Sequence, residues 1–382
     1  MYSLYDYGRM IADNVRMEAY VQALRQAVKP GSVVLDIGTG AGIFALLACK
    51  FGARRVYAIE PDDAVQVARD IAAANGYAAH IQFIQTLSSQ ITLPERADVI
   101  ISDLRGVLPL FQHHVASIAD ARHRFLAPGG VLIPQCDILW AAIVEAPDLY
   151  SRHMIPWAAN DYGLDMQIGR RIVTNSWRKG RVTPEQLLVE PQSWATLDYT
   201  KVDSPNLSAD VTWPVMRAGT AHGLSVWFDA ILAAGVGFSN APGVPELIYG
   251  SAFFPWSRPV ALAIGDTVSV ALQAILVGED YVWCWDTRVL DQGDPRQMKA
   301  NFTQSTFFGQ PLSPARLRKQ AASHRPTLNE DGQIDRLILE LMDHGISLGD
   351  IASRVSAQFP ARLATWQDAL RRVSELSNTY SR

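Results

Sequence analysis

Short apolar runs alternate with amphipathic stretches over the first third of the chain, which is the pattern of a parallel α/β sheet. Residues 33–37 form a mostly apolar run of the kind that a strand buried on both faces needs. Helical stretches are expected at 43–51 and 62–75, and a glycine follows each of them. Further strands are expected at 55–59, 81–84, 99–102 and 130–133. The pattern predicts a doubly wound α/β domain over residues 1–134.

The residue composition and the spacing of turn signals change after Pro134. Between residue 137 and about residue 290 the chain is rich in Trp, Tyr, Val and Ile, and turn signals recur, as at residues 179–180 and 240–243. A strand-like stretch such as 268–276 lies between these turns. Short strands with regular turns indicate a β-barrel or a β-sandwich. We therefore expect a β-barrel domain over residues 135–310.

The C-terminal part has the composition of a tether followed by a helical module. Residues 311–327 (PLSPARLRKQAASHRPT) combine three prolines with four Arg or Lys side chains and one His, as a solvated linker does. Within residues 328–382, apolar side chains recur at helical spacing, and SLGD at 347–350 and TWQD at 365–368 have the pattern of capping boxes. We expect three short helices that either pack on the rest of the protein or recognise a peptide.

The overall composition argues against a whole-surface attraction to nucleic acid or to a membrane, and leaves a local basic patch open. The 34 Lys and Arg and the 38 Asp and Glu give a net charge of −4, and no apolar run reaches the roughly 18 residues of a membrane-spanning helix. The N-terminus lacks the apolar core of a secretion signal. Because the three cysteines are widely separated and the adjacent His113 and His114 point to different sides of a helix, we expect no disulfide and no metal site. These features predict a soluble cytoplasmic protein.

The candidate chemistry lies in a glycine-rich turn after the first strand. The stretch DIGTGAG begins at Asp36 and places Gly38, Gly40 and Gly42 between a predicted strand and a predicted helix. Glycine lets the backbone lie against a ligand, with the helix N-terminus behind it. Glu60 follows the next strand, where an acid can accept hydrogen bonds from ribose hydroxyls. These features favour an adenosine-containing ligand over a tight turn without a ligand, and the spacing disfavours a dinucleotide, which needs G-x-G-x-x-G.

The D-x-G-x-G-x-G pattern resembles that of class I S-adenosylmethionine methyltransferases. A more specific resemblance, to the protein arginine methyltransferases, extends from near the start of the chain to about residue 305. It rests on DNVR (13–16), VVLDIGTGAGIFALLACKFGARRVYAIE (33–60), RADVIISD (96–103), FLAPGGVLIP (125–134) and YGLDM (162–166).

This resemblance implies a Rossmann-like domain followed by a β-barrel, with S-adenosyl-L-methionine as cofactor and a methyl acceptor as partner. It also implies a homodimer formed through an arm at about residues 150–170. An N-terminal segment would fold over the cofactor, and Arg16 would pair with the cofactor's carboxylate. Ser88 and Ser89 stand where the family usually has an acid near the adenine. The implied cofactor-binding residues are Tyr7, Met10, Arg16, Asp36, Gly38, Gly40, Gly42, Glu60, Ser88 and Ser89.

The acceptor site departs from the family pattern. The family binds arginine through two glutamates of one hairpin, which neutralise and orient the guanidinium. Asp103 and Gln112 occupy these positions here, Arg105 adds a positive charge to the same stretch, and Pro255 replaces the His of a Thr-His-Trp loop. Losing one charge partner of an arginine in a partly desolvated cleft typically costs ~2–5 kcal/mol. We therefore expect a methyltransferase whose acceptor, a protein, peptide or small molecule, is not an ordinary arginine.

Asp103 is the candidate general base or acceptor-orienting carboxylate, and Tyr7, Gln112 and Trp256 are expected to help form the acceptor pocket. Asp103 as an ordinary turn residue and Trp256 as part of the barrel core are the structural alternatives. The altered positions also admit a different class of function, a non-catalytic scaffold that binds cofactor or a peptide and transfers nothing.

Overall fold

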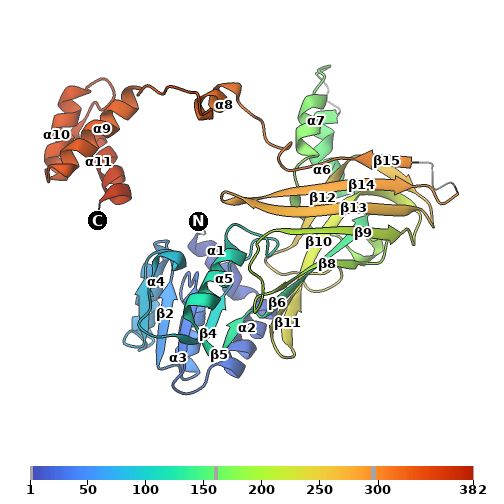
Figure 1. Ribbon diagram of the computed structural model, residues 1–382, viewed down its shortest axis with the longest axis horizontal. Helices are drawn as coiled ribbons and strands as arrows, with labels where there is room; N and C mark the ends of the chain where they lie inside the picture. Colours follow the sequence, from blue (N-terminus) through green and yellow to red (C-terminus); the bar gives the residue numbers. More distant parts are fainter. Residues whose placement is uncertain (1–2, 159–161, 294–297, 382) are drawn as a thin grey trace. The chain divides into compact units, whose positions relative to one another are not determined.

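The structure is a computed structural model that describes residues 3–158, 162–293 and 298–381. The chain divides into two compact units, Met1–Pro311 and Leu312–Arg382, each with its own apolar core. The first unit contains a parallel α/β sheet and an antiparallel β-domain, labelled in Figure 1. Among the described residues, no helix combines the length and apolar character needed to cross a membrane.

A five-stranded parallel sheet in the order β3-β2-β1-β4-β5 forms the α/β domain. Its strands are β1 (Val33–Ile37), β2 (Arg55–Ile59), β3 (Ile81–Ile84), β4 (Ala97–Ser102) and β5 (Leu126–Ile133). Its helices are α1 (Leu4–Ala12), α2 (Asn14–Ala27), α3 (Ile43–Lys50), α4 (Ala64–Ala74) and α5 (His114–Phe125). All five residues of β1 are buried, as expected for a central strand covered on both faces. The predicted doubly wound domain is confirmed, and β4 and β5 begin earlier than predicted.

The register of the central strands brings three chain segments to one sheet edge. Ile37 at the end of β1 pairs with Ile59 at the end of β2 and with Ser102 at the end of β4. The residues that follow these strands therefore emerge side by side at the carboxyl edge of the sheet. This is the edge where open α/β sheets bind their ligands.

The second domain is an antiparallel structure with two sheets. One sheet has the order β7-β12-β10-β6-β8, with β11 paired to β10, and the other has the order β15-β14-β13-β9. The strands are β6 (Cys136–Val144), β7 (Arg178–Gly180), β8 (Gln192–Asp198), β9 (Leu207–Pro214), β10 (Gly219–Ala233), β11 (Val236–Ser239), β12 (Ser251–Leu262), β13 (Thr267–Val277), β14 (Asp280–Leu290) and β15 (Met298–Phe302). The barrel-like architecture is confirmed, but several strands are long rather than short, and β10 has 15 residues. The fully buried Trp283 and Trp285 of β14 pack on Phe254 of β12 between the two sheets.

Two helices, α6 (Pro147–Ala158) and α7 (Gln167–Val173), lie between β6 and β7 in the chain. The expected dimerisation arm at about 150–170 falls on them, although residues 159–161 of that prediction lie outside the described residues. Tyr150 and Met154 of α6 pack into a small core with Phe253 of β12. Ile168 of α7, in contrast, is exposed.

The second unit holds four helices in its described part: α8 (Pro314–Gln320), α9 (Glu330–Asp343), α10 (Leu348–Gln358) and α11 (Trp366–Tyr380). The expected linker thus contains one short helix, because Ser313 caps an N-terminus that starts with Pro314. Ser347 and Thr365 accept the backbone N–H groups of Asp350 and Asp368 and so begin α10 and α11, as predicted. The last three helices bury a common core of Ile334, Ile338, Ile351, Ala352, Val355, Ala369, Val373 and Leu376.

Candidate active site

The glycine turn after β1 has no room for side chains. Gly38, Gly40 and Gly42 all have positive φ, at 73°, 52° and 87°. A Cβ on Gly40 would lie 2.3 Å from Cε1 of Tyr7, and one on Gly38 would lie 2.3 Å from Cδ2 of Leu104. The turn therefore requires glycine both for its conformation and for the approach of these two neighbours.

Two buried acids line this turn. Asp36 accepts a hydrogen bond from the Thr39 hydroxyl at 2.6 Å, while its Oδ1 has no hydrogen-bond partner among the described residues. Burial raises the pKa of Asp36 to about 7. Glu60 accepts the backbone N–H groups of Gly40 at 2.9 Å and Asp62 at 3.0 Å, and burial raises its pKa as well. An unpartnered buried carboxylate oxygen beside a glycine turn fits a ligand that brings hydroxyl or ammonium donors.

The N-terminal helix covers the turn, as the sequence predicts for the segment around Tyr7. The Tyr7 ring lies against Gly40, and the carbonyl of Met10 accepts a hydrogen bond from Arg16 Nη1 at 3.1 Å. Tyr7 therefore lies at the turn, and Met10 and Arg16 are bonded to each other. Ser88 is buried after β3 and Ser89 is exposed; neither side chain forms a hydrogen bond with the turn among the described residues.

Asp103, the candidate base, is bound on both of its carboxylate oxygens. Its Oδ2 accepts hydrogen bonds from Arg16 Nε at 2.8 Å, Arg16 Nη2 at 2.5 Å and the Tyr249 hydroxyl at 2.6 Å. Its Oδ1 accepts one from Arg105 Nη1 at 3.1 Å. Burial alone would raise the pKa of Asp103, but the charges of Arg16 and Arg105 outweigh it and lower that pKa to about 2.

Arg105 links this site to the barrel. Its Nε and Nη2 donate to both oxygens of Asp137 on β6, at 2.9 and 2.7 Å, in a bidentate pair with no exposed side-chain surface. Its Nη1 also donates to the Tyr20 hydroxyl at 2.7 Å. We refer to Arg16, Asp103, Arg105 and Asp137 as the buried charge network. Two positive and two negative charges make this network neutral.

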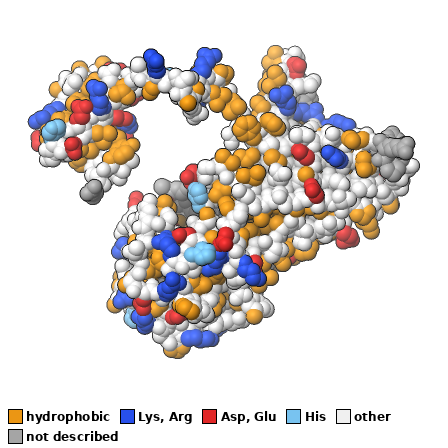
Figure 2. Space-filling model, in the orientation of Figure 1, with side chains coloured by type: hydrophobic (Ala, Val, Ile, Leu, Met, Phe, Trp, Pro, Cys, Tyr) orange, Lys and Arg blue, Asp and Glu red, His pale blue; other side chains and the backbone are white. Residues whose placement is uncertain are grey.

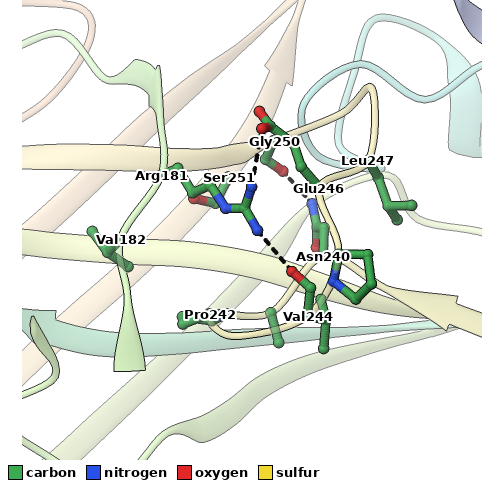
Figure 3. Close-up of a pocket in the computed structure, with 11 residues that line it drawn as sticks. Arg181, Val182, Asn240, Pro242, Val244, Glu246, Leu247, Gly250 and Ser251 are labelled. Atoms are coloured by element: carbon green, nitrogen blue, oxygen red, sulfur yellow. Dashed lines mark hydrogen bonds and ion pairs between the residues drawn. The ribbon is translucent and has the colours of Figure 1, made fainter. Parts of the chain in front are cut away.

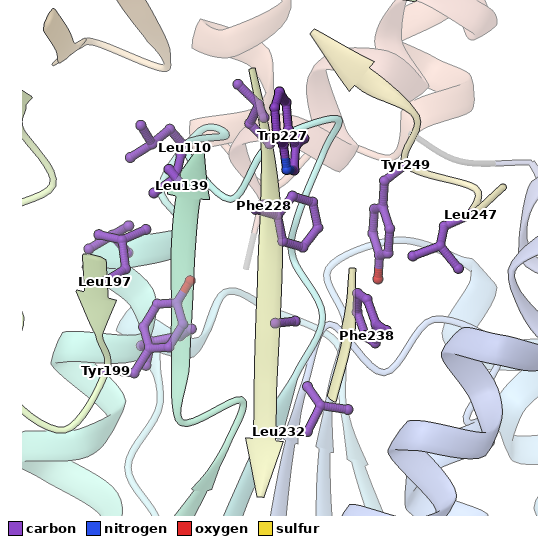
Figure 4. Close-up of a cluster of buried hydrophobic side chains, with 14 of the residues drawn as sticks. Leu110, Leu139, Leu197, Tyr199, Trp227, Phe228, Leu232, Phe238, Leu247 and Tyr249 are labelled. Atoms are coloured by element: carbon purple, nitrogen blue, oxygen red, sulfur yellow. The ribbon is translucent and has the colours of Figure 1, made fainter. Parts of the chain in front are cut away.

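The network extends into a neutral, aromatic layer of the barrel. The Tyr199 hydroxyl donates to Asp137 at 2.6 Å and lies 2.9 Å from Nε2 of His114. Burial lowers the pKa of His114 to about 3, so this imidazole is uncharged. Figure 4 shows Tyr249, Phe238 and Phe228 close together. Tyr249 stacks on Phe238 with ring centroids 5.7 Å apart. These rings exclude water and strengthen the ion pairs beside them.

Gln112, expected in the acceptor pocket, lies at the far end of the acceptor loop, which we define as residues 103–112. It is exposed and is a non-glycine residue with positive φ, at 43°. It forms no hydrogen bond with the buried charge network in the part of the chain that the structure describes. Phe111 packs on Gly106, where an added Cβ would lie 2.6 Å from the Phe111 ring. The loop thus holds Asp103 in the buried charge network and leaves Gln112 at the surface.

Trp256 and Pro255 belong to the barrel core. The Trp256 side chain has no exposed surface and packs on Phe302, with ring centroids 5.8 Å apart. The Pro255 carbonyl accepts hydrogen bonds from Trp285 and Gln304. The expectation that Trp256 lines the acceptor pocket is therefore corrected, because a fully covered side chain presents no atom to an acceptor. The structural alternative for Trp256 is the one observed.

Sequence reasoning did not identify Asp137, Tyr199 or Tyr249. Asp137 is a single acid at the start of a barrel strand, and the tyrosines are isolated aromatic residues in a domain rich in them. The one available signal was the unexplained positive charge of Arg105, which requires a buried acid as its partner. As to metals, the described residues contain no group of three or more His, Cys, Asp or Glu that could hold one.

Two family models match consecutive parts of the chain. "Ribosomal protein L11 methyltransferase (PrmA)" matches residues 18–139, and "Arginine methyltransferase oligomerization subdomain" matches residues 136–275. Protein arginine N-methyltransferase 6 of Xenopus tropicalis is 30% identical over 234 residues, covering 58% of this chain and 68% of that protein. Protein arginine N-methyltransferase PRMT10 of japonica rice is 29% identical over 314 residues, 73% and 82% of the two chains. The chain spans about half (53%) of a third relative, a probable protein arginine N-methyltransferase 6 of Arabidopsis thaliana.

Solved structures show the same fold. Arabidopsis thaliana protein arginine methyltransferase 10, in a conformation described as uniquely open, superposes with a TM-score of 0.69 at 24% identity, covering 79% of this chain and 97% of that one. The Trypanosoma brucei PRMT1 enzyme–prozyme heterotetramer with AdoHcy gives a TM-score of 0.70 at 21% identity, covering 78% and 96%.

Proposed function

Because this chain belongs to the protein arginine N-methyltransferase family, whose members are S-adenosylmethionine-dependent methyltransferases, we propose that it methylates an acceptor other than an ordinary arginine guanidinium. The observation that carries this proposal is that both oxygens of Asp103 are already bonded to arginines of the same chain. A guanidinium acceptor needs a carboxylate with free oxygens and uncompensated charge. The neutral network and the exposed Gln112 supply neither.

The residues around the glycine turn are suited to holding S-adenosylmethionine. Asp36 and Glu60 offer buried acceptors for hydroxyl or ammonium groups. Arg16, which the family resemblance pairs with the cofactor's carboxylate, is bonded in this structure to Asp103 and to the Met10 carbonyl. The cofactor supplies an already activated methyl group, so the protein mainly has to orient the acceptor and exclude water. Tyr7 and Met10 on the covering helix, and Leu104 against Gly38, shape that space.

A methyl-transfer assay with labelled S-adenosylmethionine tests the proposal. Purified protein is offered arginine-rich proteins, neutral and acidic peptides, and small nitrogen and oxygen nucleophiles, while S-adenosylhomocysteine release is measured. We expect release with an acceptor that lacks arginine. Robust formation of ω-methylarginine would contradict the altered-acceptor proposal.

The second candidate is a non-catalytic subunit that binds cofactor or a partner. The same self-neutralised acceptor loop favours it, and one solved structure of this fold is described as an enzyme–prozyme complex. The two candidates differ in turnover. A scaffold would show S-adenosylhomocysteine binding by calorimetry but no product with any acceptor.

We also propose that the chain forms a homodimer through the α6–α7 arm. Ile155 and Ile168 are more than half exposed on this arm, and exposed apolar clusters mark association surfaces. Light scattering of the wild-type chain should give twice the monomer mass. A double substitution, Ile155→Glu with Ile168→Glu, should give the monomer mass, whereas an unchanged mass would contradict this arm as the interface.

A further inference from the structure

The helix that covers the glycine turn has little of its own to hold it in place. α1 has no buried residue, and its start is capped from within the same segment by Ser3 and Asp6. One residue, Asp13, separates α1 from α2, whose Tyr20 and Leu24 are fully buried. Because α2 is anchored and α1 is not, Asp13 acts as a hinge. The position of α1 over the turn therefore depends on what holds this hinge.

Two neighbouring residues of the barrel are bonded to the hinge. The backbone N–H of Ile248 donates to Asp13 Oδ2 at 2.8 Å, while Asp13 Oδ1 accepts the backbone N–H of Arg16 at 3.2 Å and caps α2. The Tyr249 hydroxyl accepts a hydrogen bond from Arg16 Nε at 3.0 Å. Arg16 Nη1 in turn donates to the carbonyl of Met10, in the last turn of α1. The barrel thus holds the junction of α1 and α2 at two points.

The barrel segment that carries these two residues, 240–250, is itself fixed by side chains from next to it in the structure. Arg181 donates to the Val244 carbonyl at 2.7 Å, as a dashed line in Figure 3 shows. Lys179 on β7 donates from Nζ to the Ile248 carbonyl at 2.5 Å and so fixes the peptide group that follows Ile248. The segment can therefore serve as a firm support for the hinge.

Burial makes the hydrogen bonds of the Tyr249 hydroxyl count. Tyr249 is 6% exposed and Arg16 is 4% exposed, and the hydroxyl also donates to Asp103 at 2.6 Å. Hydrogen bonds to charged partners away from water are stronger than those between exposed side chains. The charged side chains on the face shown in Figure 2, by contrast, are dispersed among other types and open to water.

We propose that Ile248 and Tyr249 are positioning residues for S-adenosylmethionine. They fix the Asp13 hinge and thereby keep α1, with Tyr7 against Gly40, over the turn that the cofactor occupies. When one of these bonds is lost, the closed position of α1 is less populated, and the apparent affinity for the cofactor falls by the same fraction. This inference concerns the cofactor and goes beyond the proposed function, because it holds for any acceptor.

Calorimetry of the full chain with S-adenosylhomocysteine tests the role of Tyr249. Tyr249→Phe removes the hydroxyl and keeps the ring that stacks on Phe238, and we expect it to bind at least ~10-fold more weakly than the wild type. The matched control is Tyr199→Phe, which removes another buried hydroxyl that donates to a carboxylate, that of Asp137 at 2.6 Å. Both variants should be less stable in urea, but Tyr199→Phe should bind as the wild type does. Unchanged binding by Tyr249→Phe, or an equal loss in Tyr199→Phe, would overturn the inference.

A double-variant cycle separates positioning from a general loss of structure. Tyr7→Ala removes the contact of α1 with Gly40. In that background the position of α1 no longer affects the turn, so adding Tyr249→Phe should change the affinity for S-adenosylhomocysteine by less than ~3-fold. A further loss as large as the one that Tyr249→Phe causes alone would overturn the inference.

Asp13→Asn tests the other bond, and it decides the question if Tyr249→Phe fails to fold. Asparagine offers one acceptor oxygen in place of two, so it cannot accept both backbone N–H groups that Asp13 accepts. We expect at least ~10-fold weaker S-adenosylhomocysteine binding. Amide hydrogen exchange should become faster in α1 and stay unchanged at the buried positions of α2. Wild-type affinity, or exchange that is unchanged in α1, would overturn the inference.

Discussion

Removing one partner of the Arg105–Asp137 pair should destabilise residues 1–311 more than breaking an exposed ion pair does. Both side chains are fully covered, and the pair is bidentate at 2.9 and 2.7 Å. Removing one partner of such a pair leaves the other charged and buried, which costs ~3–5 kcal/mol of unfolding free energy. We therefore expect Arg105→Met to lower that free energy by ~3–5 kcal/mol, and Asp137→Leu to lower it by a similar amount.

The double variant distinguishes an ion pair from two independent packing losses. Because Arg105→Met with Asp137→Leu leaves neither charge behind, its loss should be at least ~2 kcal/mol smaller than the sum of the two single losses. The exposed pair Arg54–Glu95 is the control, with side chains 55% and 32% exposed, and Arg54→Met should cost less than ~1 kcal/mol.

Urea unfolding followed by tryptophan fluorescence measures these values. All of the ten tryptophans except Trp366 lie in residues 1–311, so the signal reports on the unit that holds the pair. Losses that add to within ~0.5 kcal/mol would refute the reasoning. So would an Arg105→Met variant that is no less stable than Arg54→Met.

Three further changes test other parts of the site. Gly40→Ala places a Cβ 2.3 Å from the Tyr7 ring. We expect calorimetry to show at least ~10-fold weaker S-adenosylhomocysteine binding by this variant. The control Gly8→Ala, with nothing within 4 Å of its added Cβ, should bind S-adenosylhomocysteine as the wild type does. Trp256→Ala should cost ~3–5 kcal/mol in urea unfolding, without changing the affinity of the folded protein for S-adenosylhomocysteine. The pKa of Asp36 is raised by burial from 3.8 to about 7, so its folded form keeps a proton that the unfolded chain releases. The contribution of Asp36 to stability is complete below about pH 4 and is lost as pH rises through about 7. Thermal unfolding from pH 4 to 8 should therefore show the wild type losing stability relative to Asp36→Asn. Parallel stability curves of the two proteins would contradict this.

The parts of the site that are local in sequence could be predicted from it. The glycine turn, Asp36 and Glu60 lie in one strand–turn–helix–strand segment, where the spacing of glycines and acids carries the geometry. The N-caps at Ser347 and Thr365 are equally local. In these places backbone conformation dictates residue type over a few positions, so the residue types reveal the conformation.

The parts that depend on tertiary contacts could not be predicted. The sequence places Asp103 on the right loop but does not show that Arg16, 87 positions earlier, and Arg105 both bind it. It offers Trp256 as a pocket residue because tryptophan suits both a pocket and a core, and only burial distinguishes the two. A single buried acid such as Asp137 belongs to no periodic pattern, so the sequence does not reveal that it is buried.

The buried charge network also makes the electrostatics of the acceptor site inseparable from the packing of the two domains. One oxygen of Asp103 is bound to Arg16, and the other contacts Arg105, whose main partner, Asp137, is on the barrel strand β6. Gln112→Glu would therefore add a negative charge at an exposed position without freeing Asp103. Freeing it requires the loss of Arg105, and a folded protein tolerates that loss best when Asp137 is removed as well. A return to an arginine-binding site thus needs several coupled changes, of which the Arg105/Asp137 double variant is the first.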